Sequence, residues 1–217
     1  MEGLKGEKKL SSSGKFFIFI AFAIVLVTFA LSIFFYPRLP QVIATHWNAF
    51  GEVDGFMQKF WGVFTLPIFS SAITLFFILV PKIFRTKESE KFREIYYEMA
   101  IFLSLLFLLA QIHTLLWNIG IKLNTNVFNS FTLGGLLMSF ALIFDDMWKR
   151  IKNETKGDIT FSERYDLNSV RAVSLTFKVI GIIAILGAFF PRYSVWFVVV
   201  PLMFSPFLIA LFISIKS

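Results

Sequence analysis

Long apolar runs alternate with short polar segments along the chain. A helix needs about 20 apolar residues to cross the hydrocarbon core of a bilayer. Six runs meet or approach this length: residues 16–36, 60–80, 98–120, 127–144, 172–190 and 195–215. The pattern predicts an all-α, polytopic membrane protein with about six transmembrane helices. The first run has 21 residues, whereas the apolar core of a signal peptide has about 7 to 15. We therefore interpret it as a transmembrane helix and not as a cleaved leader.

Prolines inside the runs predict where helices bend or end. Pro67 is expected to kink the second helix, and Pro81 to end it. Three hydroxyl side chains are available to satisfy the backbone groups that Pro67 frees: Ser70, Ser71 and Thr74. Pro201 and Pro206 are expected to bend the sixth helix more sharply than a smooth curve.

Other interior residues predict how the helices are held together. Thr28 and Ser32 are expected to bond back to the preceding turn of the first helix. Lys178 lies near the start of the fifth run, where it is expected to snorkel or to pair with Asp145 or Asp146. Two pairs of small residues in the fourth run have the spacing that lets helices approach closely: Ser130 with Gly134, and Gly135 with Ser139.

The basic residues are distributed unevenly between alternate segments. Sixteen Lys and Arg lie in residues 1–15, 82–97 and 149–171 and at the C-terminus, and four lie in the other three loops. Positive residues favour the cytoplasmic side of a membrane. We therefore expect both termini in the cytoplasm, the segment 37–59 outside, and a multi-pass protein of the plasma membrane.

Composition agrees with this class and excludes others. The chain has 57% hydrophobic and 16% charged residues, with a mean hydropathy of +0.74, so its main partner is the lipid bilayer. The formal charge of +7 does not indicate nucleic-acid binding, because the basic residues lie beside apolar runs. The absence of cysteine excludes disulfides, thiolate nucleophiles and cysteine-type zinc sites.

Candidate chemistry is concentrated in the segment 37–59, between the first two helices. Two aromatic residues there, Trp47 and Phe50, can lie at the membrane boundary. The other candidate ligand-binding residues of this segment combine imidazole, amide, carboxylate and ammonium groups with turn glycines: His46, Asn48, Gly51, Glu52, Asp54, Gly55 and Lys59. We expect the segment to form an ordered cap with successive turns at Asn48, Gly51, Asp54 and Gly55.

A polar face on the third helix lies close to this cap. At 100° per residue its five members occupy an arc of about 160° and should point into protein: Gln111, His113, Thr114, Trp117 and Asn118. About seven residues separate His113 from the helix end, so it lies roughly 10 Å from the boundary, where the cap can contact it. We expect His46 to lie over this face and to bond Gln111, Thr114 or Asn118.

Three interpretations of these residues remain open. His46, Glu52, Asp54 and His113 together offer the nitrogen and oxygen ligands of a zinc site, although the spacing follows no recognised metal motif. His46 with a carboxylate can also act in acid–base catalysis. The third interpretation is structural, with His46 bonded to a backbone carbonyl and the remaining residues forming turns.

The cap resembles the N-terminal signature of the SdpI-type membrane proteins. The resemblance is carried by Pro40-x-x-Ile43-x-x-His46-Trp47-Asn48-x-x-Gly51-x-x-Asp54-Gly55-Phe56-x-x-Lys59. It implies a domain of unknown function over residues 16–120, between a tail (1–15) and a three-span region (121–217) with a cytoplasmic loop (149–171). From the best-known members of this family, the resemblance implies immunity to a secreted membrane-active toxin. It also implies a cytoplasmic partner, a transcriptional repressor that the membrane protein captures. Ala44, Phe56 and Gln58 depart from the family pattern, and the family's downstream segment is not found in 149–171.

These observations lead to a primary and an alternative hypothesis for function. The primary hypothesis is a non-enzymatic receptor, signalling or immunity-like protein that recognises a peptide, toxin or envelope component through its outer segment and needs no cofactor. The alternative is a membrane metalloenzyme that uses zinc bound by His46, His113 and a carboxylate. Proton-coupled transport is disfavoured because no carboxylate lies in the middle of any span.

Overall fold

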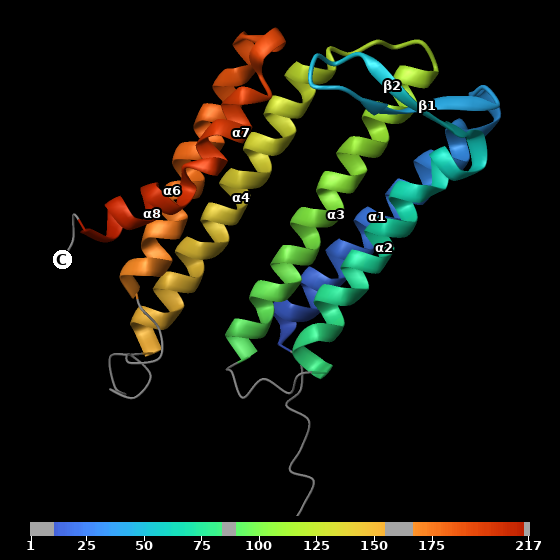
Figure 1. Cartoon of the computed structure of the whole chain (residues 1–217). Coiled ribbons are helices and arrows are strands. Elements are labelled where there is room, and N and C mark those ends of the chain that lie inside the picture. Colours follow the sequence, from blue (N-terminus) through green and yellow to red (C-terminus); the bar gives the residue numbers. More distant parts are fainter. Residues whose placement is uncertain (1–10, 84–89, 155–166, 215–217) are drawn as a thin grey trace, which may run out of the picture.

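The computed structural model describes residues 11–83, 90–154 and 167–214 and is almost entirely helical (Figure 1). The helices are α1 (Ser12–Phe35), α2 (Lys59–Ile83), α3 (Glu90–Asn118), α4 (Thr125–Glu154), α6 (Leu167–Leu186), α7 (Trp196–Met203) and α8 (Ser205–Ser214). Short 3-10 turns occupy η1 (Tyr36–Arg38), η2 (Gly187–Phe189) and η3 (Pro191–Tyr193). Strands β1 (Val42–Trp47) and β2 (Val53–Gln58) form an antiparallel hairpin, the one sheet in the described residues.

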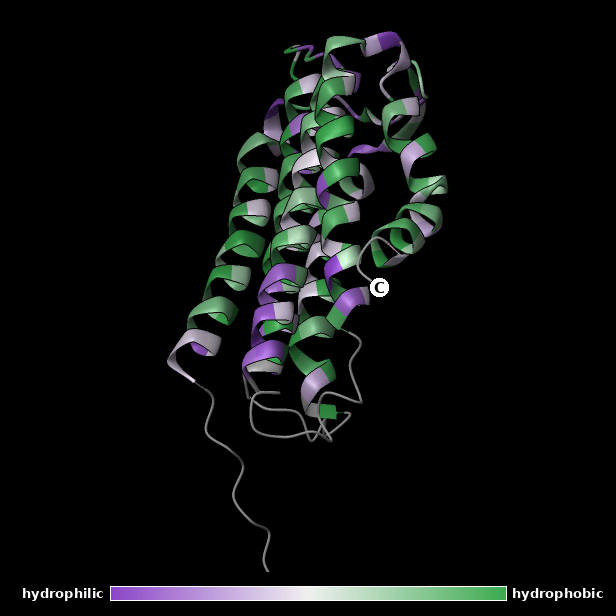
Figure 2. Cartoon of the chain, turned by 90° about the vertical axis from the view of Figure 1, so that its left-hand side faces the viewer, coloured by the Kyte–Doolittle hydropathy of each residue, from purple (hydrophilic) through white to green (hydrophobic). Residues whose placement is uncertain are grey.

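Five of these helices are long and apolar enough to cross a membrane, and α7 with α8 makes a sixth candidate. The prediction of an all-α, polytopic membrane protein is confirmed. The helices are hydrophobic along most of their length, and hydrophilic residues gather toward the ends (Figure 2). Below, the end of the bundle that carries the β-hairpin is called the hairpin end, and the other is called the opposite end.

Several helix limits differ from the predicted ones. α4 continues ten residues past Phe144 to Glu154, so the first part of the expected loop 149–171 is helical. α3 begins at Glu90, α2 runs through Pro81 to Ile83, and α1 begins at Ser12, within the expected tail. Charged side chains support the extensions at the opposite end, because Arg150 of α4 pairs with both Glu94 and Glu98 of α3 at 3.2 and 3.4 Å. Apolar length alone therefore underestimates these helices.

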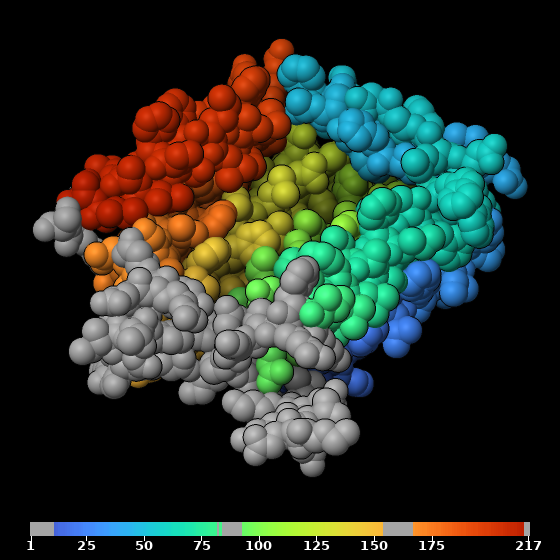
Figure 3. Space-filling model, turned by 60° about the horizontal axis from the view of Figure 1, so that its bottom comes forward, coloured from blue at the N-terminus to red at the C-terminus, as the bar shows by residue number. Residues whose placement is uncertain are grey.

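The helices form two groups that meet along α3 and α4 (Figures 1 and 3). α1, α2 and α3 pack together under the hairpin, and α4 packs closely on α6, with α7 and α8 beside it. Contact between α3 and α4 is much sparser than the contact of α4 with α6. Gly134 makes the α4–α6 approach possible, because a Cβ there would lie 2.9 Å from the carbonyl oxygen of Gly181. The predicted close approach is therefore found at Gly134. It is not found at Gly135, where a Cβ would meet no other atom within 4 Å.

A buried amide compensates for the proline in α2. Pro67 has no N–H to donate to the Val63 carbonyl one turn earlier. Gln111 of α3 is fully buried and donates from Nε2 to that carbonyl oxygen at 3.0 Å and to Ser32 Oγ at 2.9 Å. Ser70, Ser71 and Thr74 were expected to do this, but Ser71 donates to the Pro67 carbonyl and Thr74 bonds Ser104. The side chain that satisfies the Val63 carbonyl therefore comes from the neighbouring helix α3 and not from α2 itself.

Three other interior predictions are confirmed. Thr28 and Ser32 donate to the carbonyls four residues earlier, both at 2.8 Å. Lys178 pairs with Asp145 of α4. The last helix is broken between Met203 and Ser205, with a bend of 53° between α7 and α8, next to the two prolines that cannot continue the hydrogen-bond ladder.

The orientation of the bundle remains a prediction that cysteine labelling can test. Lys5, Lys216 and residue 156 lie outside the described residues, but Glu52 at the hairpin end and Lys152 at the opposite end are exposed. Because the chain has no cysteine, a single cysteine at each position gives an unambiguous signal. We expect an impermeant maleimide added to intact cells to label Glu52→Cys, and to label Lys152→Cys only after lysis. Labelling of both in intact cells would contradict the topology.

Candidate functional site

One asparagine organises the tip of the hairpin. Asn48 Oδ1 accepts hydrogen bonds from the backbone N–H of Phe50 at 2.9 Å and of Glu52 at 3.0 Å, and its Nδ2 donates to Glu52 Oε2 at 3.1 Å. Gly51 has φ of 80°, a conformation that costs glycine little. The predicted turn at Asn48 and Gly51 is confirmed. The prediction of further turns at Asp54 and Gly55 is wrong, because both residues lie within β2.

Gly55 has a different role, which depends on its cross-strand partner. It faces His46 in the register of the hairpin, next to an irregularity in β1. A Cβ at position 55 would lie 2.7 Å from the Cβ of His46, much closer than two carbon atoms can approach. Glycine is therefore required here by the space between the strands.

Asn118, at the end of α3, holds strand β1 in place. Its Oδ1 accepts from the N–H of Ala44 at 2.8 Å, and its Nδ2 donates to the Ala44 carbonyl at 2.9 Å and to the Thr114 carbonyl at 2.8 Å. The side-chain amide thus pairs with β1 as a neighbouring strand would. The expected partner of the third helix was His46, but the structure uses the backbone of Ala44.

Apolar contacts fix the hairpin on the three-helix group. Ile43 of β1 is fully buried with Leu39, Val63 and Leu115, and all four belong to one cluster. An isolated hairpin is at best marginally stable in water. Burying a side chain of this size contributes about 1.5–3 kcal/mol, so docking on the helices accounts for the order of this segment.

Trp47 connects the hairpin to the polar face of α3. The centroid of its ring lies 4.7 Å from the ring centroid of His113 and 5.5 Å from the ring centroid of Trp117, and both contacts are edge to face. His113 is 4% exposed, packs against Phe128 at 4.9 Å and has Nε2 3.2 Å from the hydroxyl of Thr125. The predicted contact of His113 with this segment is therefore confirmed, and it is made through Trp47.

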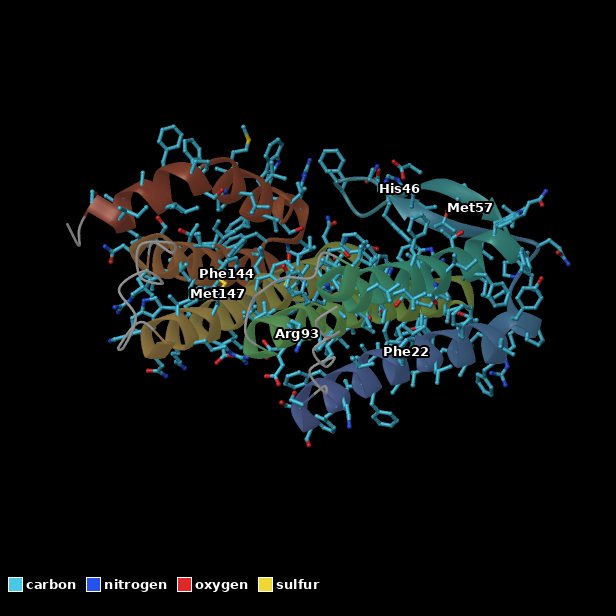
Figure 4. All side chains as sticks on the ribbon, turned by 90° about the horizontal axis from the view of Figure 1, so that it is seen from below. Phe22, His46, Met57, Arg93, Phe144 and Met147 are labelled. Atoms are coloured by element: carbon cyan, nitrogen blue, oxygen red, sulfur yellow. The ribbon has the colours of Figure 1, made fainter. Side chains whose placement is uncertain are left out.

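His46 points away from the helices. Its Nδ1 lies 2.5 Å from Asp54 Oδ1, and 71% of the His46 side chain is exposed. Figure 4 shows His46 at the edge of the molecule, on the hairpin. The expectation that His46 bonds Gln111, Thr114 or Asn118 is wrong, because successive side chains of a strand face opposite sides. Ile43 and Trp47 of β1 face the helices, and His46 lies on the other face beside Asp54.

The residues considered as zinc ligands are divided between separate environments. Asp54 pairs with His46, Glu52 bonds Asn48, and His113 is buried among aromatic rings. Within residues 11–83, 90–154 and 167–214, no group of three or more His, Asp or Glu side chains is arranged to hold a metal ion. The structure thus brings together one pair of the four candidates.

The remaining candidate residues serve the packing of the hairpin end. Thr114 bonds back to the Ala110 carbonyl at 3.0 Å, and Gln111 lies in the core of the three-helix group. The ammonium of Lys59 lies 4.6 Å from the ring centroid of Tyr36, a cation–π contact. These contacts position the hairpin on the helices.

Asn126, which sequence reasoning did not identify, joins the two helix groups. Its Nδ2 donates to the Ala49 carbonyl at the hairpin tip, at 3.3 Å, and to the Pro191 carbonyl in η3, at 2.8 Å. Gly51 packs against the same side chain, which a Cβ there would approach to 3.2 Å. In the sequence this residue resembles any polar residue near the start of a helix, so nothing there indicates a bridge over 65 residues.

The hairpin has one closed and one open edge. Because the N–H and C=O of Ala44 face Asn118, the residue opposite, Phe56, also directs its backbone groups away from the partner strand. The described residues provide no hydrogen bond to the outward N–H or C=O of Phe56. Its side chain is 64% exposed and that of the adjacent Met57 43%. Strand β2 therefore presents an apolar edge with free hydrogen-bonding groups.

The fold and this site define an all-helical, multi-pass membrane protein in which a β-hairpin covers one end of a three-helix group. Residues 23–70, which include the second half of α1, the hairpin and the first half of α2, match a domain of unknown function (DUF1648) that is found in membrane proteins. No curated protein and no solved structure matches the chain significantly.

Proposed function

We propose that the chain is a non-enzymatic receptor or immunity-like protein that recognises an extended peptide, such as a membrane-active toxin or an envelope component, through the hairpin. The observation that carries this proposal is the open edge of β2. An exposed strand edge can bind an extended chain as a third strand, with backbone hydrogen bonds for affinity and side-chain contacts for selection.

The two edges of the hairpin differ in a way that favours one side for binding. Asn118 occupies the edge of β1 through both backbone groups of Ala44. Phe56 on β2 has the same two groups directed outward and an exposed aromatic ring beside them. An incoming peptide would therefore pair along β2 and contact Phe56 and Met57.

The alternative of a zinc metalloenzyme has less support. It requires His46, His113 and a carboxylate on one ion, whereas His46 is exposed beside Asp54 and His113 is buried among aromatic rings. The resemblance of the hairpin to the SdpI-type signature supports recognition over catalysis. In this proposal the protein acts in the plasma membrane with the hairpin outside, and a cytoplasmic regulator is a possible second partner.

A protection assay with an edge-blocking variant tests the proposal. Bacteria expressing the chain would be challenged with a panel of membrane-active peptides, and the lethal concentration of each would be measured. We expect the wild type to raise it for at least one peptide and Phe56→Pro to abolish the protection, because proline removes the outward N–H without removing a β1–β2 hydrogen bond. Phe56→Ala, which keeps the N–H, is the matched control and should retain part of the protection.

Two results would contradict the proposal. One is a lack of protection against every peptide, and the other is protection that Phe56→Pro leaves unchanged. Purified protein that binds stoichiometric zinc and loses it in His46→Ala would favour the metalloenzyme instead.

A further inference from the structure

An apolar groove made of two neighbouring cavities lies between the two helix groups, along the sparse contact of α3 with α4. It comprises a cavity of about 310 Å³ toward the opposite end and a second of about 170 Å³ nearer the hairpin, and Phe102 lines both. Its walls are mostly apolar side chains of both helices, including Leu105, Leu109, Leu136 and Leu142, and Phe17 of α1 lines the larger cavity. From position 98 to position 109 of α3 it extends roughly 16 Å along the helix axis. These dimensions suit an extended alkyl chain.

The wider cavity ends at an unbalanced charge cluster. Glu98 and Asp146 line its wall, and 17% and 42% of their side chains are exposed. Both pair with Arg150, which also pairs with Glu94. One guanidinium is thus shared by three carboxylates, so these four groups carry a formal charge of −2 when ionised. An added cation stabilises such a cluster and an added anion destabilises it.

We propose that this groove binds a single-chain amphiphile with a cationic head group. The ammonium would lie beside Glu98 and Asp146, where charge-assisted hydrogen bonds to partly buried carboxylates are strong. The alkyl chain would lie between α3 and α4 and cover apolar surface there. The negative mouth selects against phosphate or sulfate head groups, which is the reason for a cationic amphiphile and not a phospholipid. This site is separate from the hairpin and does not depend on the function proposed for it.

Gly135 offers a way to close the groove without disturbing the helices. It lines the narrower cavity, and a Cβ built there would meet no other atom within 4 Å. A leucine at this position should therefore extend into the groove and occupy the space of the alkyl chain. Alanine would add too little volume to do so, which makes Gly135→Ala the matched control.

Photo-crosslinking tests the proposal with defined probes. The protein would be placed in phosphatidylcholine nanodiscs with a dodecylamine that carries a diazirine in mid-chain, and adducts would be mapped by mass spectrometry. We expect adducts on groove residues such as Leu105 and Leu136, with competition by unlabelled dodecylamine and not by dodecyl sulfate. The paired substitution Glu98→Gln with Asp146→Asn should reduce labelling of the groove at least about tenfold, which corresponds to 1.4 kcal/mol. Gly135→Leu should abolish it.

The controls distinguish the proposed occupant from others. Gly135→Ala and Asp145→Asn, which alters the separate pair with Lys178, should label as the wild type does. Equal labelling by the dodecyl sulfate analogue, adducts spread over all lipid-facing helices, or no effect of neutralising the carboxylates would overturn the proposal. A disulfide between two copies of Leu105→Cys protein would show that a second chain fills the groove, and would also overturn it.

Discussion

Replacing Gly55 with alanine should release the hairpin from the bundle while the helices remain inserted. The new Cβ would lie 2.7 Å from the Cβ of His46, and neither atom can move without its backbone. Overpacking of this kind costs about 1–3 kcal/mol, which is large for a two-stranded sheet held by one apolar cluster, the ring contacts of Trp47 and two asparagines. The helices should persist, because their stability comes from lipid burial and helix packing.

Hydrogen exchange measures this effect directly. At a cost of about 2 kcal/mol, amides of residues 42–58 should exchange on the order of thirtyfold faster, since 1.4 kcal/mol is a factor of ten. Asp54→Ala is the control, because it removes only an exposed pair, worth up to about 1 kcal/mol. Equal exchange in the two variants would show that the space beside His46 is not what requires glycine. Fast exchange of these amides in the wild type would show that the hairpin is not an ordered cap.

Two adjacent glycines of α4 should respond oppositely to the same substitution. A Cβ at Gly134 would lie 2.5 Å from Ile185 Cγ1 and 2.9 Å from the Gly181 carbonyl oxygen, so α4 and α6 must separate in Gly134→Ala. We expect a loss of about 1–3 kcal/mol at the most extensive helix contact in the described part of the chain. Gly135→Ala meets no atom within 4 Å and removes a helix-interior glycine, so it should be neutral or stabilising by up to about 1 kcal/mol.

Thermal unfolding in a mild detergent compares the two variants. Gly134→Ala should lower the midpoint clearly, and Gly135→Ala should leave it unchanged or raise it. If both variants lower the midpoint equally, the two residues share one interface and the placement of α4 on α6 is incorrect.

Local composition was sufficient to predict the helices and several of their contacts. A segment inside a bilayer must satisfy its own backbone groups, so long apolar runs imply helices. Proline cannot donate a hydrogen bond, and the break between Met203 and Ser205 follows the prolines on either side. Lys178 cannot remain alone among apolar residues, and its pairing with Asp145 was among the predicted outcomes. In each case the physical requirement acts within one helix or between near neighbours at one membrane depth.

The tertiary structure alone decided how the polar residues at the hairpin end are used. The sequence indicated that His46, Asn48, Asp54, His113 and Asn118 lie near one another, because a short segment joins two helices beside the polar face of a third. It did not indicate that residues 42–47 form a strand, whose alternate side chains face opposite sides. Trp47 therefore contacts the third helix and His46 faces Asp54, while Asn118 bonds the backbone of Ala44.

The same limit applies to the contacts that join distant segments. Gln111 bonds the carbonyl that Pro67 frees, and Asn126 bonds the hairpin tip and η3. Buried polar groups need hydrogen-bond partners. The long apolar runs identify the chain as a membrane protein and mark its helices. Which partner each group finds depends on helix rotation and relative height, and these are set by the packing of all the helices together.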